Sequence, residues 1–201
     1  PVLIENLHLA TYGNSAASAL AYSGEVAFHN VDTSFYKTGQ YHSTMIRIIQ
    51  LLGKVGGRQA TELLWKKIDF PDKRIVSEIL KSLSYIGFEA RDFQAARIKI
   101  ILESTISDIA WNIKTLEDLE IESPVDEAIA EALREENKNN YDNIFMLLSM
   151  IYDAQNVLLV KENIEAGTTE SVTFGVEMLD LFCEEELKPK LFPVLDDLKP
   201  E

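Results

Sequence analysis

The sequence contains residue types that enzymes and metal sites use, but their spacing forms no catalytic pattern. The run Gly53–Gly57 is rich in glycine and contains Lys54. Its glycines stand in the wrong order for a phosphate-binding loop, which needs GxxxxGK followed by Ser or Thr. The run therefore fits a helix end better than a nucleotide site. The histidines are His8, His29 and His42, and they are too widely spaced to form a metal-ligand motif.

Other reactive or aromatic side chains fit packing better than chemistry. Cys183 ends an apolar helical stripe, so we expect a buried thiol rather than a nucleophile. No serine stands in the GxSxG pattern of a nucleophile elbow. Trp65 and Trp111 lie beside apolar residues at helical spacing, so we expect both to pack in a core. We predict no catalytic, cofactor-binding or metal-binding residues and no enzymatic activity.

Charge is distributed unevenly along the 201 residues. The chain carries 33 acidic and 19 basic residues, a net charge of −14, which argues against a general nucleic-acid-binding protein. Residues 37–114 carry 13 basic and 8 acidic residues, and the rest of the chain is strongly acidic. No apolar run approaches the length of about 20 residues that spans a bilayer. We expect a soluble, cytoplasmic protein without direct membrane insertion.

Hydrophobic periodicity predicts an almost wholly helical chain, with hardly any strand signal. Asp72 is the expected N-cap of one helix, and Pro124 is expected to open another. The expected helices cover 43–55, 58–68, 73–86, 92–117, a helix that opens at 124, 143–152, 157–164, 171–183 and 187–198.

Two of the expected helices repeat each other. The pattern Met45-Ile48-Ile49-Leu52-Val55-Gly56 recurs as Val76-Ile79-Leu80-Leu83-Ile86-Gly87, at an offset of 31 residues. A weaker echo links 144–151 to 172–179 at an offset of 28. Helix pairs that recur every ~30–45 residues are typical of an α-solenoid. A compact helical bundle is the alternative.

Residues 53–87, GKVGGRQATELLWKKIDFPDKRIVSEILKSLSYIG, resemble a HEAT repeat. The resemblance implies a right-handed α-α superhelix of HEAT/armadillo-like helix pairs. Residues 141–167 and 174–198, with EMLD and LKPKLFPVLDD, resemble the HEAT-like region of bacterial ATP/ADP-translocase-related membrane proteins. In that family this region follows a major-facilitator-type transport domain, and a cyclic-nucleotide-binding domain sometimes follows it. We expect a single domain, with a helical cap or linker at 1–42 and a solenoid at 43–201.

The chain starts at Pro1, which fits either loss of an initiator methionine or a piece of a longer protein, and the resemblance favours the piece. The expected function is a non-catalytic protein-binding scaffold, a cytoplasmic regulatory region at the inner face of the membrane. Its expected partner is a neighbouring transport or cyclic-nucleotide-binding domain, or another chain.

Helix positions off the apolar stripe are the expected partner-binding residues: Arg47, Arg74 and Lys81. The alternative function is a HEAT-scaffold enzyme or ligand-binding protein, similar to DNA glycosylases or bilin lyases. An aromatic-lined basic groove around Trp65 or Trp111 would favour that alternative.

Overall fold

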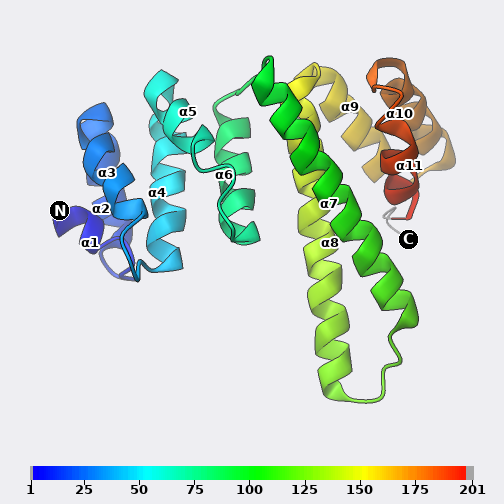
Figure 1. The fold of residues 1–201 in the computed structure, drawn as a ribbon, viewed down its shortest axis with the longest axis horizontal. Coiled ribbons are helices and arrows are strands. Elements are labelled where there is room, and N and C mark those ends of the chain that lie inside the picture. Colours follow the sequence, from blue (N-terminus) through cyan, green and yellow to red (C-terminus); the bar gives the residue numbers. More distant parts are fainter. Residues whose placement is uncertain (1, 198–201) are drawn as a thin grey trace. The chain divides into compact units, whose positions relative to one another are not determined.

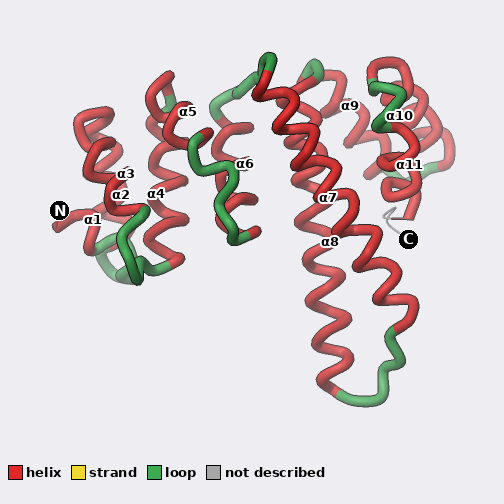
Figure 2. The backbone as a smooth tube through the Cα atoms, in the orientation of Figure 1, coloured by secondary structure: helices red, strands yellow, loops and turns green. Residues whose placement is uncertain are grey.

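The computed structural model describes residues 2–197, and all regular structure in this part of the chain is helical (Figures 1 and 2). The prediction of an all-α protein is confirmed. The chain divides into two compact units, Pro1–Phe88 and Glu89–Glu201. The division expected after residue 42 stays a prediction. The elements of the first unit are α1 (Val2–Glu5), α2 (Gly13–Ser23), the 3-10 helix η1 (Gly24–Ala27), α3 (Phe28–Phe35), α4 (His42–Val55), α5 (Gly57–Trp65) and α6 (Lys73–Tyr85).

Helix α4 lies at the centre of the first unit and packs against both α2 and α6. Its apolar stripe and the stripe of α6 are buried at equivalent positions, 31 residues apart. Those residues, each at most 1% exposed, are Ile48, Ile49 and Leu52 on α4 and Ile79, Leu80 and Leu83 on α6. Each such side chain stabilises the fold by roughly 1.5–3 kcal/mol through removal from water. The repeat seen in the sequence is therefore a repeat of core positions.

The ends of α4 and α6 also match the predicted signals. Asp72 caps α6, because its Oδ1 accepts hydrogen bonds from the backbone N–H groups of Arg74, at 2.8 Å, and Ile75, at 3.3 Å. Gly56 and Gly87 follow the two helices with φ of 67° and 69°, in the left-handed region that glycine adopts without strain.

Helices α4 and α6 run parallel, with the shorter α5 between them in the chain. Three contacts show this direction, because the residue numbers increase on both helices from one contact to the next. Gln50 Nε2 donates to Glu78 Oε1 at 3.0 Å, Gly53 lies against Ser82, and Gly56 lies against Ile86. This is the packing expected of successive equivalent helices in a solenoid. The superhelix itself stays a prediction.

Within residues 1–42, the segment from Val2 to Phe35 is mostly helical. Leu7, Phe28 and Phe35 are at most 1% exposed, so this segment contributes to the core of the first unit. An ion pair between Asp32 of α3 and Lys67, just beyond α5, also connects it to the following helices.

The second unit contains a long hairpin of α7 (Phe93–Asp118) and α8 (Pro124–Ile151). The expectation of a separate helix at 143–152 is wrong, because residues 124–151 form one continuous helix. Ser123 and Asp126 start this helix with a reciprocal capping box, and Pro124 occupies its first turn as predicted. Buried asparagines lie along the hairpin, and Asn112 Nδ2 donates to Asn137 Oδ1 at 2.9 Å.

The remaining helices of the second unit are α9 (Ala154–Glu165), α10 (Thr169–Phe182) and α11 (Lys188–Asp197). Helix α9 packs against α8 and α10, and α11 packs against α7. Gly175 of α10 permits the close approach to α9, because a Cβ there would lie 3.2 Å from Val160 O. The last residue of the expected helix 187–198 lies outside the described residues.

Candidate partner-binding face

Helices α2, α4 and α6 of the first unit expose polar side chains along one side. On α4 these are Arg47, Gln50 and Lys54, which follow one another at helical spacing of three and four residues. We use the name α2–α4–α6 face for the residues that line two neighbouring cavities: Asn14, Ala17, Ser18, Arg47, Gln50, Leu51, Gly53, Lys54, Glu78, Lys81, Ser82 and Tyr85.

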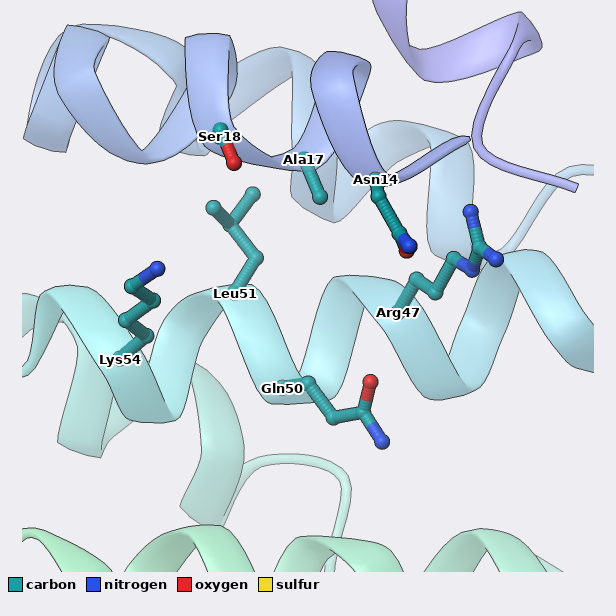
Figure 3. A pocket seen from close by; sticks show the side chains of 7 residues that line it. All are labelled: Asn14, Ala17, Ser18, Arg47, Gln50, Leu51 and Lys54. Atoms are coloured by element: carbon teal, nitrogen blue, oxygen red, sulfur yellow. The ribbon is translucent and has the colours of Figure 1, made fainter. Parts of the chain in front are cut away.

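The first cavity lies between α2 and α4 and has a volume of about 300 Å³. Figure 3 shows Arg47 beside Asn14 at one end and Lys54 at the end near Ser18. Gln50 and Leu51 lie between the two cations on α4. No Asp or Glu is among the seven residues that line this cavity. It therefore has a positive lining with neutral hydrogen-bonding groups around it.

Arg47 is held against the start of α2. A Cβ at Gly13 would lie 1.4 Å from Arg47 Nη1 and 2.5 Å from Leu7 O, so a larger residue would displace the guanidinium and also clash with the backbone. Arg47 Nη1 is buried and makes no hydrogen bond within the described part of the chain. The side chain as a whole is half-buried.

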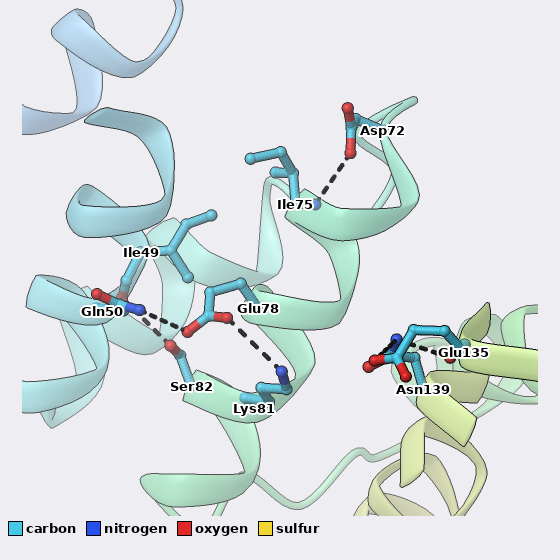
Figure 4. Close-up of polar contacts among 9 residues, drawn as sticks. All are labelled: Ile49, Gln50, Asp72, Ile75, Glu78, Lys81, Ser82, Glu135 and Asn139. Carbon is cyan, nitrogen blue, oxygen red and sulfur yellow. Dashed lines mark hydrogen bonds and ion pairs between the residues drawn. The ribbon is translucent and has the colours of Figure 1, made fainter. Parts of the chain in front are cut away.

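The second cavity lies between α4 and α6 and has a volume of about 400 Å³. Glu78 is the acidic residue of its lining, and both carboxylate oxygens are engaged (Figure 4). Oε1 accepts from Gln50 Nε2 at 3.0 Å, and Oε2 lies 3.9 Å from Lys81 Nζ. Gln50 and Lys54 line both cavities, so the cavities adjoin along α4.

Exposed tyrosines accompany these cations. Tyr85 lines the second cavity and is 79% exposed. Tyr22, one helical turn beyond Ser18 on α2, is 95% exposed. Tyrosine and arginine are enriched among the residues that contribute most to protein–protein binding, because they combine a large contact area with hydrogen bonding. The composition of this surface therefore suits a protein ligand.

The three predicted partner-binding residues lie at three different places in the structure. Arg47 lines the first cavity and Lys81 the second. Arg74 lies one turn before Glu78 on α6, is exposed, and lines neither cavity. Whether these residues bind a partner stays a prediction.

Sequence reasoning missed several lining residues. Lys54 could have been found, because it stands seven residues after Arg47 and thus on the same helix face. Asn14 and Ser18 had no such signal, since they come from a segment of small residues with little apolar periodicity. Ser82 lines the second cavity although it is buried, and its Oγ donates to Ile49 O at 3.3 Å.

A third cavity, of about 420 Å³, lies between α7 and α11 in the second unit. Its two cations already have acidic partners. Lys114 Nζ lies 2.9 Å from Asp118 Oδ1, and Lys190 Nζ lies 2.9 Å from Glu103 Oε1. In contrast, Arg47 and Lys54 pair with no carboxylate in the described part of the chain. The cavity between α2 and α4 is therefore the stronger candidate for an acidic ligand.

The tryptophans and the cysteine take different positions. The expectation that Trp111 packs in a core is wrong, since it is 65% exposed on α7. Trp65 is half-buried and stacks on Phe88, with 5.4 Å between ring centroids. Cys183 is buried, as predicted, and burial raises the pKa of its thiol. A thiol of this kind is a poor nucleophile at neutral pH.

Neither tryptophan lines any of the three cavities described here. Among residues 2–197, no group of three His, Cys, Asp or Glu side chains is placed to hold a metal ion. Within the same residues, no helix has both the length and the apolar character needed to cross a membrane.

No protein-family model, curated protein or solved structure matches this chain.

Proposed function

We propose that this chain is a non-catalytic protein-binding scaffold built from HEAT-like helix pairs, which docks a partner protein on the α2–α4–α6 face. One observation carries the proposal. Two adjoining cavities lie along parallel helices and share Gln50 and Lys54. Together they bring three cations, Arg47, Lys54 and Lys81, onto one side of the first unit.

The helix pairing supports the HEAT-like part of the proposal. The equivalent core positions of α4 and α6 are equally buried, and both helices are followed by a left-handed glycine. In solenoids, parallel equivalent helices present a continuous surface on which side chains of successive repeats form one binding site. The cavities between α2, α4 and α6 follow that arrangement.

The proposal extends to a cellular setting. We place the chain in the cytoplasm, as a regulatory region of a transporter-like membrane protein. Its partner is a neighbouring transport or cyclic-nucleotide-binding domain, or another chain. This part rests on the endings EMLD and LKPKLFPVLDD in the second unit.

Affinity capture tests the proposal. The chain is immobilised and exposed to soluble and detergent-solubilised membrane fractions, and retained proteins are then purified and rebound individually. We expect a retained protein to bind the wild type and to lose binding to the Arg47→Glu/Lys81→Glu variant. The matched control is Lys37→Glu/Lys66→Glu, which makes the same charge change at two exposed lysines of the same unit that line neither cavity.

The control variant should bind like the wild type. Equal binding by the wild type and the Arg47→Glu/Lys81→Glu variant would show that the α2–α4–α6 face is not the docking surface. Retention of nucleic acid without any protein would favour the enzyme alternative.

A further inference from the structure

The cavity between α2 and α4 is built for a negatively charged group. Arg47 and Lys54 stand seven residues, about two helical turns, apart on one face of α4, and both line the cavity. The lining contains no carboxylate that would balance their charges. The Arg47 guanidinium is packed against Gly13. An acidic ligand would supply the missing negative charge.

The neutral lining of the same cavity suits a carboxylate. Asn14 and Ser18 each carry a side-chain donor at its edge. Hydrogen bonds from cationic and neutral donors to a carboxylate are shorter and stronger than those between neutral groups. At about 300 Å³ the cavity has room for one acidic side chain with its neighbouring backbone.

The adjoining cavity indicates how the ligand continues. Glu78 is already bonded to Gln50 and paired with Lys81, so Lys54 is the one cation of this lining that Glu78 does not balance. Its outer side carries the exposed ring of Tyr85. A ligand that extends from the first cavity into the second therefore passes from a positive to a less positive, aromatic surface. An extended peptide fits this change better than a small free anion does.

We propose that the α2–α4 cavity binds an Asp or Glu side chain from an extended segment of the partner protein, which continues across Lys54 toward Tyr85. The inference rests on the proposed docking function and specifies the chemistry of the docked segment. Charge complementarity identifies a protein segment rich in acidic residues, with an apolar or aromatic residue after the acid.

Peptide selection tests this inference. A displayed random dodecapeptide library is selected on the immobilised full chain and, in parallel, on the Arg47→Gln/Lys54→Gln variant. The control variant, Lys37→Gln/Lys66→Gln, removes two exposed positive charges of the same unit that lie outside the cavities. We expect enrichment of Asp and Glu on the wild type and the control, and no such enrichment on Arg47→Gln/Lys54→Gln.

Affinity measurements with a selected peptide complete the test. Lys54→Gln leaves the packing of Arg47 intact, so it keeps the test valid if the double variant folds poorly. We expect Lys54→Gln to weaken binding about tenfold, the loss typical of one charge-assisted contact. Replacement of the peptide's acid by its amide should weaken binding similarly, and added salt should weaken it further.

The contrary results are distinct. Selected peptides that depend on the face but contain no enriched acid would overturn this inference and leave the proposed function standing. Peptides that bind the Arg47→Glu/Lys81→Glu variant as well as the wild type would overturn both. Displacement of the peptide by inorganic phosphate at equal concentration would indicate a small-anion site instead. Self-association that depends on Lys54, measured by sedimentation, would assign the acidic segment to a second copy and overturn the partner assignment.

Discussion

Gly53 of α4 lies so close to Ser82 of α6 that a Cβ at residue 53 would be 2.9 Å from both Cβ and Oγ of the serine. Both residues are buried, and both line the cavity between these helices. The glycine therefore sets the distance between α4 and α6. It also brings Gln50 within hydrogen-bonding distance of Glu78, one turn earlier along the same contact.

Gly53→Ala should lower the free energy of unfolding by about 1–3 kcal/mol, the usual cost of an overpacked core position. This loss should appear although alanine favours an isolated helix by about 1 kcal/mol over glycine. Urea unfolding measures it. Ser84→Ala is the control, because Ser84 is exposed and occupies the equivalent position of α6. Ser82→Gly should restore stability in the Gly53→Ala background, and a lack of any restoration would contradict the contact argument.

Asp32→Ala should destabilise the first unit more than Lys67→Met does. Lys67 is 2% exposed, its Nζ pairs with Asp32 and donates to Leu63 O at 3.2 Å, and it lies 5.0 Å from the Phe35 ring centroid. Burial lowers the pKa of Lys67, and the ion pair with Asp32 opposes that shift.

Removal of Asp32 leaves a buried charge without its partner, which costs about 3–5 kcal/mol, whereas an apolar side chain of similar size at residue 67 is close to neutral. Thermal and urea unfolding of the two single variants and the double variant show which substitution lowers the stability more. An equal loss in both single variants would mean that packing of the lysine stem, rather than its charge, holds α3 against α5.

Asp72→Ala should remove the N-cap of α6 and cost about 1 kcal/mol of stability. Partial burial of Asp72 favours the neutral acid. The backbone N–H groups of Ile75 and Arg74 and the nearby His42, at 3.0 Å, outweigh burial and hold the pKa below its ordinary value of 3.8. The folded state therefore binds this proton less readily than the unfolded state does.

The stability from Asp72 is consequently present above pH 3.8 and is lost as the pH falls through the lowered pKa. Asp72→Asn keeps a side-chain cap but not the charge, so it should show little of this pH dependence. Unfolding of the three proteins at a series of acidic pH values measures the differences. A constant difference between wild type and Asp72→Asn at all pH values would contradict the assignment.

Asn137→Ala should destabilise the hairpin of α7 and α8 by about 1–3 kcal/mol, because it leaves the buried amide of Asn112 without its acceptor. Asn139→Ala is the matched control on the same helix, since Asn139 is exposed and donates to Glu135 O at 2.9 Å (Figure 4). Replacement of both Asn112 and Asn137 by leucine should cost less than the single change. A larger loss in the double variant would show that the hydrogen bond does not account for the single-variant effect.

The sequence by itself determined the helical class and several local details. Apolar residues at helical spacing marked α4 and α6, and the offset of 31 residues located equivalent core positions such as Ile48 and Ile79. Asp72 marked the start of α6, and Gly56 marked the end of α4. These features can be predicted from the sequence because they depend on residues that are close together in the chain.

Tertiary packing decided the features that depend on contacts between residues far apart in the sequence. The sequence predicted a separate helix at 143–152, yet residues 124–151 form the single helix α8, whose buried Asn137 accepts a hydrogen bond from Asn112 of α7. Lys67 is buried because Asp32 and two aromatic rings meet it from another part of the chain.

The composition of the cavity between α2 and α4 was likewise decided by packing. Arg47 could be recognised from its helix face, but Asn14 and Ser18 reach the cavity only because α2 packs in parallel beside α4. Helical periodicity fixes which side of a helix is polar. Which helices meet, and which polar residues then face one another, follows from the burial of their apolar sides against each other.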